Sequence, residues 1–527
     1  MDKVTTVKIA GPAGTGIKSA GLLLAKMLTE SGYNFKDYSE YPSLVRGGHN
    51  TYQVSFSSGE VYSVHKMVDI FVSLVPGHWQ EHQEEFGKNT LIFADNEGKN
   101  NIPFGKMCEQ LGGTIYSNTI SLGLISFLLD LDKNKNTKIL KEYFGSDSVN
   151  IKAFEVGWQW GENNYRQKVK SQKSKVKKEK MIVDGNEAVG WGLVKAGLDM
   201  FVAYPMTPAT GVLHFLAKNQ DEFKIKVIHP EDEIAVASIA SGASMAGSRS
   251  AVGTSGGGFA LMTETISFDA MAELGVVYFL SQRPGPATGM PTWTSQGDLL
   301  FAVHSGHGEF TKAVVAPGDV EEAFELGKKS LNLANEFDIP VIMLSDKNLS
   351  ESSANVRDLA KEKKEIVESK KVIPGKKMTI KMYNSYEHDE EGYSIEDSQN
   401  TLKMVEARLK KEKAVLKKMP KVNLFGSNKA KKIIVSWGST KGAILEALKE
   451  MKNKEDYAFM QIRGLWPIDP KIGQIINAFK ERILIENNAT AQLGTLLKSQ
   501  MKVDFEKVIL KYDGRPFFPE EIKKFLI

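Results

Sequence analysis

The amino-acid sequence predicts an α/β protein built from three units, and three observations lead to this fold class. With 527 residues the chain is too long for one hydrophobic core, and its length alone favours about three domains. Short apolar runs typical of strands alternate with stretches of helix length over most of the chain. A basic segment and a lysine-rich segment, both without strand patterns, interrupt this alternation and divide it into three parts.

Composition limits the classes of function. The chain is 42% hydrophobic and 25% charged, as in ordinary soluble globular proteins, and its net charge of +4 gives no electrostatic footprint for nucleic acid. We find no leader-like segment at the start and no apolar run long enough for a membrane helix, so we expect a cytoplasmic protein. The single cysteine, Cys108, cannot form an internal disulfide or hold an iron–sulfur cluster, so any cluster must lie on another chain.

The first predicted unit covers residues 1–165. Its strand-like runs VKIA, TYQVSF, IFVSLV and TLIFAD alternate with helical stretches such as IKSAGLLLAKMLTESG, which predicts α/β structure with mostly parallel strands. The basic run RQKVKSQKSKVKKEK at 166–180 follows this unit. Such a run of like charges is typical of a solvated linker.

A glycine-rich turn, GPAGTGIKSAG at 11–21, follows the first strand. Without Ile17 it would match the phosphate-binding loop of nucleotide hydrolases, in which the lysine directly follows the last glycine. Ile17 moves Lys18 by one residue, about 100° around a helix, so we do not expect ATP hydrolysis. Two interpretations stay open: Gly14 and Gly16 hold the phosphates of a dinucleotide or of CoA, or they form a purely structural turn.

A second pair of glycines lies in EYPSLVRGGHN. Arg46, Gly47 and Gly48 bring a guanidinium and two open backbone amides together there, which suits an anionic group. A tight turn with a surface arginine explains the same residues equally well.

The second predicted unit, 181–350, places turns rich in Gly, Pro and Thr at strand ends, where ligands bind in open α/β sheets. In FVAYPMTPAT, Thr207 before Pro208 predicts a helix N-cap, although its hydroxyl also suits a substrate carboxylate. Arg283 follows a strand of buried character and precedes a loop of Pro and Gly. Its guanidinium can bind a carboxylate through two hydrogen bonds, or pair with a nearby acid.

Three acids, Glu231, Asp232 and Glu233, open the helix predicted in IHPEDEIAVASIASGASMAG. Interaction with the helix dipole accounts for two of them. The same helix carries small residues on a face that would let a backbone or a flat cofactor approach closely: Ala235, Ala237, Ala240 and Gly242.

Residues 351–425 form a predicted connector, lysine-rich and poor in strand patterns, with a helical stretch NTLKMVEARLKKEKAVLKKM. A third α/β unit is predicted over 426–527. Its segments KKIIVSWGSTKGAILEALKEM, YAFMQIRGLWPI and RILIENNATAQLGTLL each have the order strand, turn and helix.

Seven long motifs follow one another along the chain: YPMTPAT, EDEIAVASIASGA, TSGGGFALMTE, QRPGPATGMPT with QGDL, EHDEEGYSIED, SWGST and IENNATAQL. In this order they resemble the alpha subunit of the 2-oxoacid:ferredoxin oxidoreductases. Residues 1–165, with GPAGTG and EYPSLVRGG, resemble the family's gamma subunit. The chain therefore resembles a gamma–alpha fusion with a gamma-type domain, a thiamine diphosphate (TPP) pyrimidine-type domain and a transketolase C-terminal-like domain. The match is nearest to the 2-oxoglutarate type, and enzymes acting on pyruvate or branched-chain oxoacids share most of it.

The resemblance implies oxidative decarboxylation of a 2-oxoacid with CoA to acyl-CoA and carbon dioxide, with electrons passed to ferredoxin. It implies that Glu233 hydrogen-bonds the aminopyrimidine ring of TPP, and that Thr207 and Arg283 bind the substrate carboxylate. The other residues expected to contact a cofactor or CoA are Ser255 and Gly256 in TSGGGF, and Gly14, Gly16, Arg46, Gly47 and Gly48 in the first unit.

The chain departs from the family pattern in TSGGGF, where TSGPGF is usual, and in QRPGPATG, where QRGGPSTG is usual. Pro284 stiffens the residue after Arg283 and could shift the substrate preference. The sequence contains no Gly-Asp-Gly motif, which such enzymes use to hold Mg²⁺ and the diphosphate.

We therefore expect no metal ligands on this chain. Mg²⁺, half of the TPP site and an iron–sulfur cluster belong on a beta subunit, in a heterotetramer of two alpha and two beta chains, and this chain alone is expected to be inactive. Two other classes of function stay open: a phosphate-binding NTPase module on an inert scaffold, and a catalytically silent relative of the enzyme.

Overall fold

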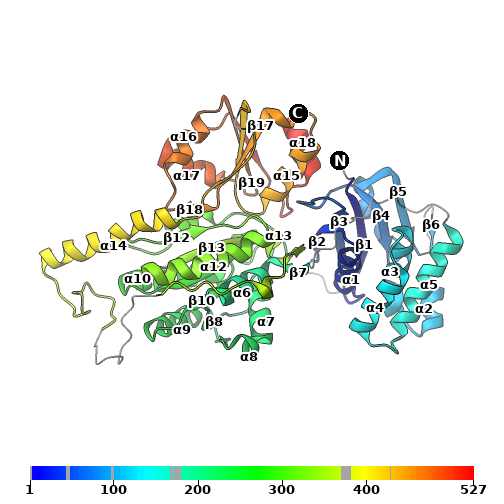
Figure 1. The fold of residues 1–527 in the computed structure, drawn as a ribbon, viewed down its shortest axis with the longest axis horizontal. Coiled ribbons are helices and arrows are strands. Elements are labelled where there is room, and N and C mark those ends of the chain that lie inside the picture. The colour runs from blue at the N-terminus through cyan, green and yellow to red at the C-terminus, as the bar shows by residue number, and fades with distance from the viewer. Residues whose placement is uncertain are drawn as a thin grey trace. The chain divides into compact units, whose positions relative to one another are not determined.

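The computed structural model describes residues 3–42, 48–95, 100–165, 169, 180–368, 382–427 and 429–527. These residues form two compact units (Figure 1). The N-terminal unit contains Met1–Ile182, Ser352–Asp358 and Phe518–Ile527, and the large unit contains Val183–Glu351 and Leu359–Phe517. Most of the predicted basic linker, 166–180, lies outside the described residues.

A mixed eight-stranded sheet forms the N-terminal unit, in the order β6-β5-β4-β1-β3-β2-β14-β7. Strand β1 is parallel to β4 but antiparallel to β3, and β2 is also antiparallel to β3. The expectation of mostly parallel strands is therefore wrong for this unit, because the short connection between β2 and β3 cannot hold the crossover helix that a parallel pair requires. The strands are β1 Thr5–Pro12, β2 Asn34–Glu40, β3 His49–Ser57, β4 Val68–Ser73, β5 Phe86–Ala94, β6 Asn100–Asn101, β7 Met181–Asp184 and β14 Ser353–Val356.

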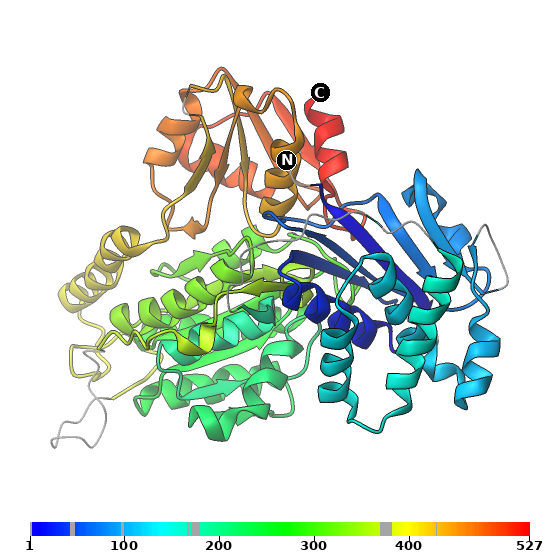
Figure 2. The same ribbon diagram turned by 45° about the vertical axis from the view of Figure 1, so that its right-hand side comes forward.

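Helices α1, α3 and α5 cover one face of this sheet around a hydrophobic core (Figures 1 and 2). Helices α3 and α5 meet at glycines. A Cβ added to Gly123 would lie 2.0 Å from Phe154 O, and one added to Gly157 would lie 1.9 Å from Ile120 O. The helices of the unit are α1 Ile17–Glu30, α2 Phe104–Leu111, α3 Ser117–Leu128, α4 Lys133–Phe144, α5 Val149–Asn164 and α18 Pro519–Leu526, with the 3-10 helices η1 His78–Glu85 and η2 Thr114–Tyr116.

Two segments from late in the chain complete the N-terminal unit. Strand β14 pairs with β2, and the Asp37 carboxylate of β2 accepts hydrogen bonds from the Tyr52 hydroxyl and the Ser353 amide. Near the C-terminus, Glu520 of α18 accepts a hydrogen bond of 3.2 Å from the Lys66 amide. The first segment comes from the predicted connector and the second from the predicted third unit, so the N-terminal unit is not continuous in sequence.

The large unit contains two sheets. The seven-stranded sheet has the order β18-β12-β13-β11-β10-β8-β9, and the five-stranded sheet has the order β15-β17-β16-β19-β20. Both are parallel except for one antiparallel edge strand each, β18 and β15. The strands are β8 Met200–Val202, β9 Lys226–Ile228, β10 Ser250–Thr254, β11 Val276–Gln282, β12 Ala313–Val315, β13 Val341–Asp346, β15 Asn423–Gly426, β16 Lys432–Ser436, β17 Tyr457–Gln461, β18 Gly464–Trp466, β19 Glu481–Glu486 and β20 Lys507–Leu510.

The helices of the large unit connect these strands in the way that parallel sheets require. They are α6 Gly185–Lys195, α7 Thr210–Lys218, α8 Gln220–Phe223, α9 Glu233–Met245, α10 Gly256–Met271, α11 Leu299–His304, α12 Val320–Phe337, α13 Lys347–Glu351, α14 Ser398–Lys418, α15 Thr440–Glu450, α16 Lys471–Asn477 and α17 Gln492–Met501, with short 3-10 helices at Leu359–Lys361 and Lys454–Asp456. The helix α14 confirms the helical stretch expected in the connector.

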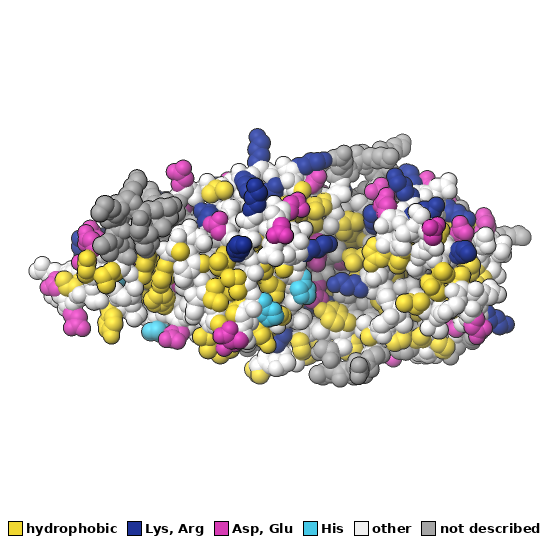
Figure 3. Space-filling model, turned by 90° about the horizontal axis from the view of Figure 1, so that it is seen from below, with side chains coloured by type: hydrophobic (Ala, Val, Ile, Leu, Met, Phe, Trp, Pro, Cys, Tyr) yellow, Lys and Arg dark blue, Asp and Glu magenta, His cyan; other side chains and the backbone are white. Residues whose placement is uncertain are grey.

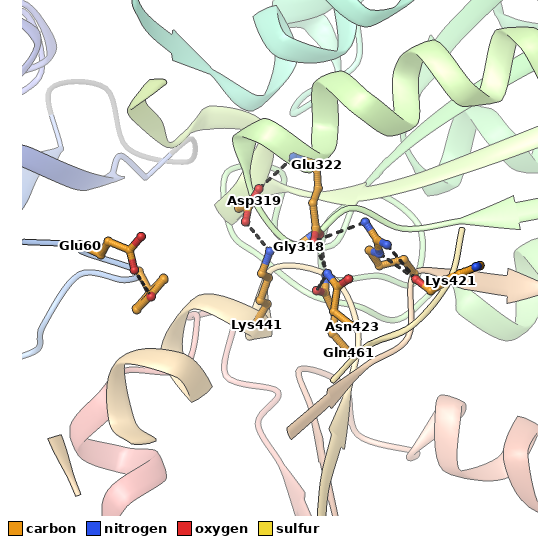
Figure 4. Close-up of polar contacts among 10 residues, drawn as sticks. Glu60, Gly318, Asp319, Glu322, Lys421, Asn423, Lys441 and Gln461 are labelled. Atoms are coloured by element: carbon orange, nitrogen blue, oxygen red, sulfur yellow. Dashed lines mark hydrogen bonds and ion pairs between the residues drawn. The ribbon is translucent and has the colours of Figure 1, made fainter. Parts of the chain in front are cut away.

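A buried polar network joins the two sheets of the large unit (Figure 4). Its centre is the Glu322 carboxylate in the first turn of α12. Lys441 Nζ of α15 lies 2.8 Å from Glu322 Oε1, and Gln461 Nε2 of β17 donates to Glu322 Oε2 at 2.6 Å. Asn423 of β15 donates to Glu322 Oε1 at 2.9 Å. Hydrophobic residues of both sheets also belong to one core cluster, so the two sheets fold against each other.

Within the described part of the chain, no single helix has both the length and the apolar character needed to cross a membrane. Helix α2 with the stretch Thr114–Leu128 meets the test of length and composition only as a pair, which is bent by 117°.

Candidate active site

The candidate site lies in the large unit, where three neighbouring parallel strands end. Strands β8, β10 and β11 are in parallel register, so their carboxyl ends meet at one edge of the sheet. Thr207 lies in the loop after β8, Ser255 directly follows β10, and Arg283 directly follows β11. This is the edge at which open α/β sheets bind ligands.

Thr207 and Arg283 are in direct contact, because Arg283 Nη1 donates a hydrogen bond of 2.7 Å to the Thr207 carbonyl oxygen. The N-cap expected at Thr207 is wrong. The peptide bond from Thr207 to Pro208 is cis, a turn closes between Met206 and Ala209, and α7 begins only at Thr210. The Thr207 carbonyl therefore faces Arg283, and its hydroxyl does not cap the helix.

Glu233 is the first residue of α9, and its side chain does not cap the helix either. Asp232 is the N-cap, and its carboxylate accepts a hydrogen bond of 2.8 Å from the Ala235 amide. Glu233 itself is only 5% exposed, and its Oε1 has no hydrogen-bond partner among the described residues. An unpaired buried carboxyl oxygen is costly, so this atom points to a missing ligand.

The glycines of TSGGGF shape the space around Glu233. A Cβ added to Gly258 would lie 2.6 Å from Glu233 Cγ and 2.7 Å from Oε1, whereas a Cβ on Gly257 would meet nothing within 4 Å. Gly257 occupies the place where proline is usual in the family pattern. This departure therefore falls at a position where the structure leaves room for a side chain.

Ser255 and Gly256 begin α10. Ser255 is the N-cap, but its side chain makes no capping hydrogen bond, and its buried Oγ has no partner among the described residues. A Cβ on Gly256 would lie 2.9 Å from Asp298 Oδ2. The start of α10 thus offers a second unpaired polar atom, and the next residue, Gly256, lies against an acidic side chain.

Charge at this edge of the sheet is divided between Arg283 and Asp298. Burial lowers the pKa of Arg283, while the nearby Asp298 raises it. Burial raises the pKa of Asp298 to about 6, while Arg283 lowers it. The two groups therefore interact, and Asp298 belongs to the site although we did not single it out from the sequence.

The small residues of α9 do not form the single open face that we expected. Ala237 and Ala240 are fully buried in the core of the large unit. The outer side of the helix carries Ile234, which is 51% exposed, with Ser238 and Gly242 at successive turns. Hydrophobic side chains gather on this face of the large unit (Figure 3). The helix therefore divides its small residues between the core and an exposed stripe formed by Ile234, Ser238 and Gly242.

The predicted phosphate-binding residues lie in the N-terminal unit. Gly14 and Gly16 adopt φ angles of 91° and 75°, which favour glycine, and Gly16 is the N-cap of α1. The Ala13 amide donates to the Gly48 carbonyl oxygen at 3.0 Å, so the two glycine segments meet. Arg46 and Gly47 lie outside the described residues.

The insertion in the glycine loop has the expected consequence. Ile17 is buried in the core of the N-terminal unit, and Lys18 on the next position of α1 is exposed. Burial of Ile17 fixes the register of α1, and it leaves the lysine outside the loop.

Comparison with known proteins places this geometry in a family. Residues 191–421 match the model described as pyruvate flavodoxin/ferredoxin oxidoreductase, thiamine diphosphate-binding, and residues 6–160 match pyruvate ferredoxin/flavodoxin oxidoreductase. The 2-oxoacid:ferredoxin oxidoreductase subunit alpha of a Sulfolobus species is 29% identical over 98% of this chain and 96% of its own length. Subunit alpha of 2-oxoacid:ferredoxin oxidoreductase 1 from Aeropyrum pernix is 30% identical over 77% of this chain and 70% of its own length.

Among solved structures, a 2-oxoglutarate:ferredoxin oxidoreductase from Magnetococcus marinus, with 2-oxoglutarate, coenzyme A and succinyl-CoA bound, matches with a TM-score of 0.94. It is 27% identical, and the match covers 100% of this chain and 99% of the other. Fold and site thus define the class: an α/β oxidoreductase subunit with a TPP-binding domain. The chain belongs to the 2-oxoacid:ferredoxin oxidoreductase alpha-subunit family, which confirms the resemblance seen in the sequence.

Two residues of the site escaped the sequence interpretation. Asp298 lies in the QGDL motif, and Gln282 immediately precedes Arg283. Gln282 is fully buried, and its Oε1 accepts a hydrogen bond of 2.9 Å from the Asp298 amide. The sequence did contain a signal for Gln282, because it is a polar residue at the end of an otherwise apolar strand. The roles of Glu233, Thr207, Arg283, Ser255 and Gly256 stay predictions.

Proposed function

We propose that this chain is the alpha-plus-gamma part of an enzyme that decarboxylates 2-oxoglutarate oxidatively, with CoA as acceptor of the acyl group and ferredoxin as acceptor of the electrons. The observation that carries this proposal is the unpaired, buried Oε1 of Glu233 at the ligand-binding edge of the sheet. The names of relatives support the choice of oxoacid: subunits KorA of a 2-oxoglutarate oxidoreductase in Mycobacterium tuberculosis and of a 2-oxoglutarate synthase in Methanocaldococcus jannaschii are 24% and 29% identical. Pyruvate or a branched-chain 2-oxoacid is the alternative substrate.

The residues around Glu233 fit one end of TPP. Its Oε1 can share a hydrogen bond with a ring nitrogen of the aminopyrimidine, which would satisfy the unpaired atom. Gly258 keeps side-chain volume away from Glu233, and the Ser255 hydroxyl offers a second unpaired group at the start of α10. When bound, TPP supplies the electron sink that makes loss of carbon dioxide from a 2-oxoacid feasible. The contribution of Glu233 is to hold the proton at Oε1 that faces the ring.

Arg283 and Thr207 orient the substrate in this proposal. A guanidinium has five N–H donors, and the hydrogen bond to the Thr207 carbonyl uses one of them. The others remain to bind a carboxylate through two parallel hydrogen bonds. Holding the carboxylate in one orientation lowers the entropic cost of reaching the reactive geometry.

The rest of the enzyme must come from a partner. The sequence has no Gly-Asp-Gly motif and one cysteine, so we infer that a beta subunit provides Mg²⁺, the diphosphate half of the TPP site and the iron–sulfur cluster. The exposed stripe of Ile234, Ser238 and Gly242 on α9 is the surface on which we place it, in a cytoplasmic heterotetramer of two alpha and two beta chains. In the N-terminal unit, Gly14, Gly16 and Gly48, with Arg46 and Gly47, are the proposed contacts of the CoA phosphates.

The test uses this chain co-expressed with a beta partner, and measures the reduction of a viologen dye by 2-oxoacids in the presence of CoA. Glu233→Gln should lower the rate by roughly a hundredfold or more while the complex still assembles, because the amide cannot hold the proton at this position. Glu231→Gln, an exposed acid of the same segment, is the matched control and should keep its activity. Full activity of Glu233→Gln, or assembly without turnover of any 2-oxoacid, would overturn the proposal.

A further inference from the structure

Asp298 has a fixed position beside the proposed substrate site. Its main-chain amide donates to Gln282 Oε1 at 2.9 Å, and Gln282 Nε2 donates to the Ser345 carbonyl oxygen at 2.9 Å. Gln282 is fully buried and directly precedes Arg283. One glutamine therefore ties Asp298 to the strand that delivers Arg283.

The carboxyl group of Asp298 interacts with Arg283 and does not cap a helix. It makes no capping hydrogen bond to α11, although Asp298 occupies the N-cap position of that helix. Instead it lies against the start of α10: a Cβ on Gly256 would be 2.9 Å from Oδ2 and 3.4 Å from Oδ1. The side chain is thus directed to the same edge of the sheet as Arg283.

The groups that face Asp298 are few. Arg283 at the end of β11 is the charged group that interacts with it. Helix α10 presents Gly256, and α17 presents the neutral Gln492, whose Nε2 donates to the neighbouring Gly297 carbonyl. Glu233 contacts α10 at Gly258, two residues and therefore about 200° around the helix from Gly256.

A substrate carboxylate bound by Arg283 would lie close to the Asp298 carboxyl group. Two carboxylates close together cannot both stay ionised without cost, and a neighbouring negative charge raises the pKa of a carboxyl group. Burial has already brought the pKa of Asp298 to about 6, so a modest further rise makes the group protonated near neutral pH.

We propose that Asp298 is a proton-linked residue of the substrate site, which takes up one proton from solvent when a 2-oxoacid carboxylate binds at Arg283. The proposal rests on the function proposed above, in which Arg283 is the carboxylate-binding residue. In the free site the ionised Asp298 balances the charge of Arg283, and in the occupied site the substrate carboxylate takes its place. Ionised Asp298 therefore disfavours substrate binding at high pH, and protonated Asp298 allows it at low pH.

Linkage gives the size of the effect. Above the pKa of the free acid, each pH unit weakens substrate binding by up to about tenfold, because each bound substrate must bring a proton with it. A neighbouring charge shifts a pKa by about one to three units, so from a free-acid pKa of about 6 KM should rise by about fivefold to fiftyfold between pH 6 and pH 8. The value of kcat should follow pH less steeply, because Asp298 acts on binding.

The experiment uses the assembled complex with its beta partner. KM for 2-oxoglutarate is measured by dye reduction from pH 6 to 8, for the parent and for Asp298→Asn. We expect a rise of at least about fivefold in the parent and a flat profile in the variant. Proton uptake is measured separately by calorimetric titration with N-oxalylglycine, a 2-oxoglutarate analogue that is not decarboxylated, in two buffers of different ionisation enthalpy. For a shift of one to three units, the parent should take up about 0.2 to 0.9 of a proton per ligand at pH 7.5, and the variant none.

The controls separate this inference from the function on which it rests. Asp221→Asn, an exposed acid on α8, should behave like the parent, and Asp298→Ser replaces Asp298→Asn if the latter fails to assemble. An unchanged pH profile and unchanged proton uptake in the Asp298 variant overturn the inference while the proposed function stands. Absence of turnover in the parent, or an unchanged KM in Arg283→Gln, overturns the proposed function itself.

Discussion

Single glycines set the shape of the site around Glu233. Gly258→Ala would place a methyl group 2.2 Å from Thr254 Oγ1 and 2.7 Å from Glu233 Oε1, so the glutamate must move. A shift of this size at a positioned group costs roughly a hundredfold in rate, and we expect kcat/KM of the assembled complex to fall by about that factor. The measurement is dye reduction with 2-oxoglutarate.

Gly257→Ala is the matched control for this change, because its Cβ meets nothing within 4 Å. It should leave kcat/KM within about twofold of the parent and slightly favour the helix. Equal losses in the two alanine variants would contradict the role given to Gly258.

A second residue, Asp37 in the N-terminal unit, should make the attachment of β14 depend on pH. Burial raises the pKa of Asp37 from 3.8 to about 6, against hydrogen bonds from Tyr52 and Ser353 that lower it. The folded state therefore prefers the protonated acid, so stability is lost as pH rises from 3.8 to about 6 and is low above that window. The full effect is on the order of 3 kcal/mol.

Hydrogen exchange of the Ser352–Asp358 segment, corrected for the intrinsic pH dependence of exchange, tests this prediction. Protection should be higher at pH 5 than at pH 7, and Asp37→Asn should remove the difference because asparagine does not ionise. The same pH dependence in the asparagine variant would show that another group is responsible.

Local sequence identified part of the candidate site, for physical reasons that differ between residues. Glu233 stands at a helix start, Arg283 directly follows a strand and Thr207 lies in the loop after one, and strand and helix patterns can locate such positions. Gln282, at the end of β11, could have been located in the same way, but Asp298 could not. Asp298 reaches the site through a long loop after β11, and only its contact with Gln282 and Gly256 shows its place.

At the scale of elements, the packing of α3 against α5 depends on glycine. The Cβ of Gly157→Ala would lie 1.9 Å from the Ile120 carbonyl oxygen, which is main chain and cannot turn aside. The two helices must separate, and overpacking of this kind costs about 1–3 kcal/mol. We expect faster hydrogen exchange throughout α3 and α5.

Gly87→Ala on β5 provides the comparison, since its nearest neighbours are side-chain atoms 3.9 Å away. It should change the exchange of α3 and α5 little. If Gly157→Ala exchanged as slowly as Gly87→Ala, the close approach of these helices would not limit the stability of the unit.

Helices and strands were predictable where the sequence pattern of the segment itself determines its secondary structure. The sheets of the large unit and the helix α14 follow from apolar runs and helical periodicity. The antiparallel pairs of the N-terminal unit were missed because β2, with the sequence NFKDYSE, has no apolar run that marks it as a strand, and only its short connection to β3 indicates an antiparallel pair. Strand β14 and helix α18 join the N-terminal unit through contacts across hundreds of residues, which no local pattern records. On α9, Ala237 and Ala240 pack in the core whereas Ser238 and Gly242 are exposed, and residue composition does not show which small residues are buried.

At the scale of the whole molecule, the network around Glu322 joins the two sheets of the large unit in addition to their shared hydrophobic core (Figure 4). The Lys441 side chain is only 9% exposed and pairs with both Asp319 and Glu322. Lys441→Met would leave Glu322 buried with amide donors and a more distant Arg463 at 3.8 Å. Removing one partner of a buried pair is costly because the other charge stays desolvated, so we expect a loss of roughly 3 kcal/mol.

The loss should be visible as urea-dependent hydrogen exchange in α12 and α15, the two helices that this pair joins. Lys432→Met is the matched control: Lys432 pairs with Glu481 at 3.1 Å, but about a third of each side chain is exposed, so the cost should stay below about 1 kcal/mol. Adding Glu322→Gln to Lys441→Met should restore part of the stability, because it removes the stranded charge. If the double variant were no more stable than Lys441→Met, lost packing of the lysine stem, and not the unpaired carboxylate, would account for the effect.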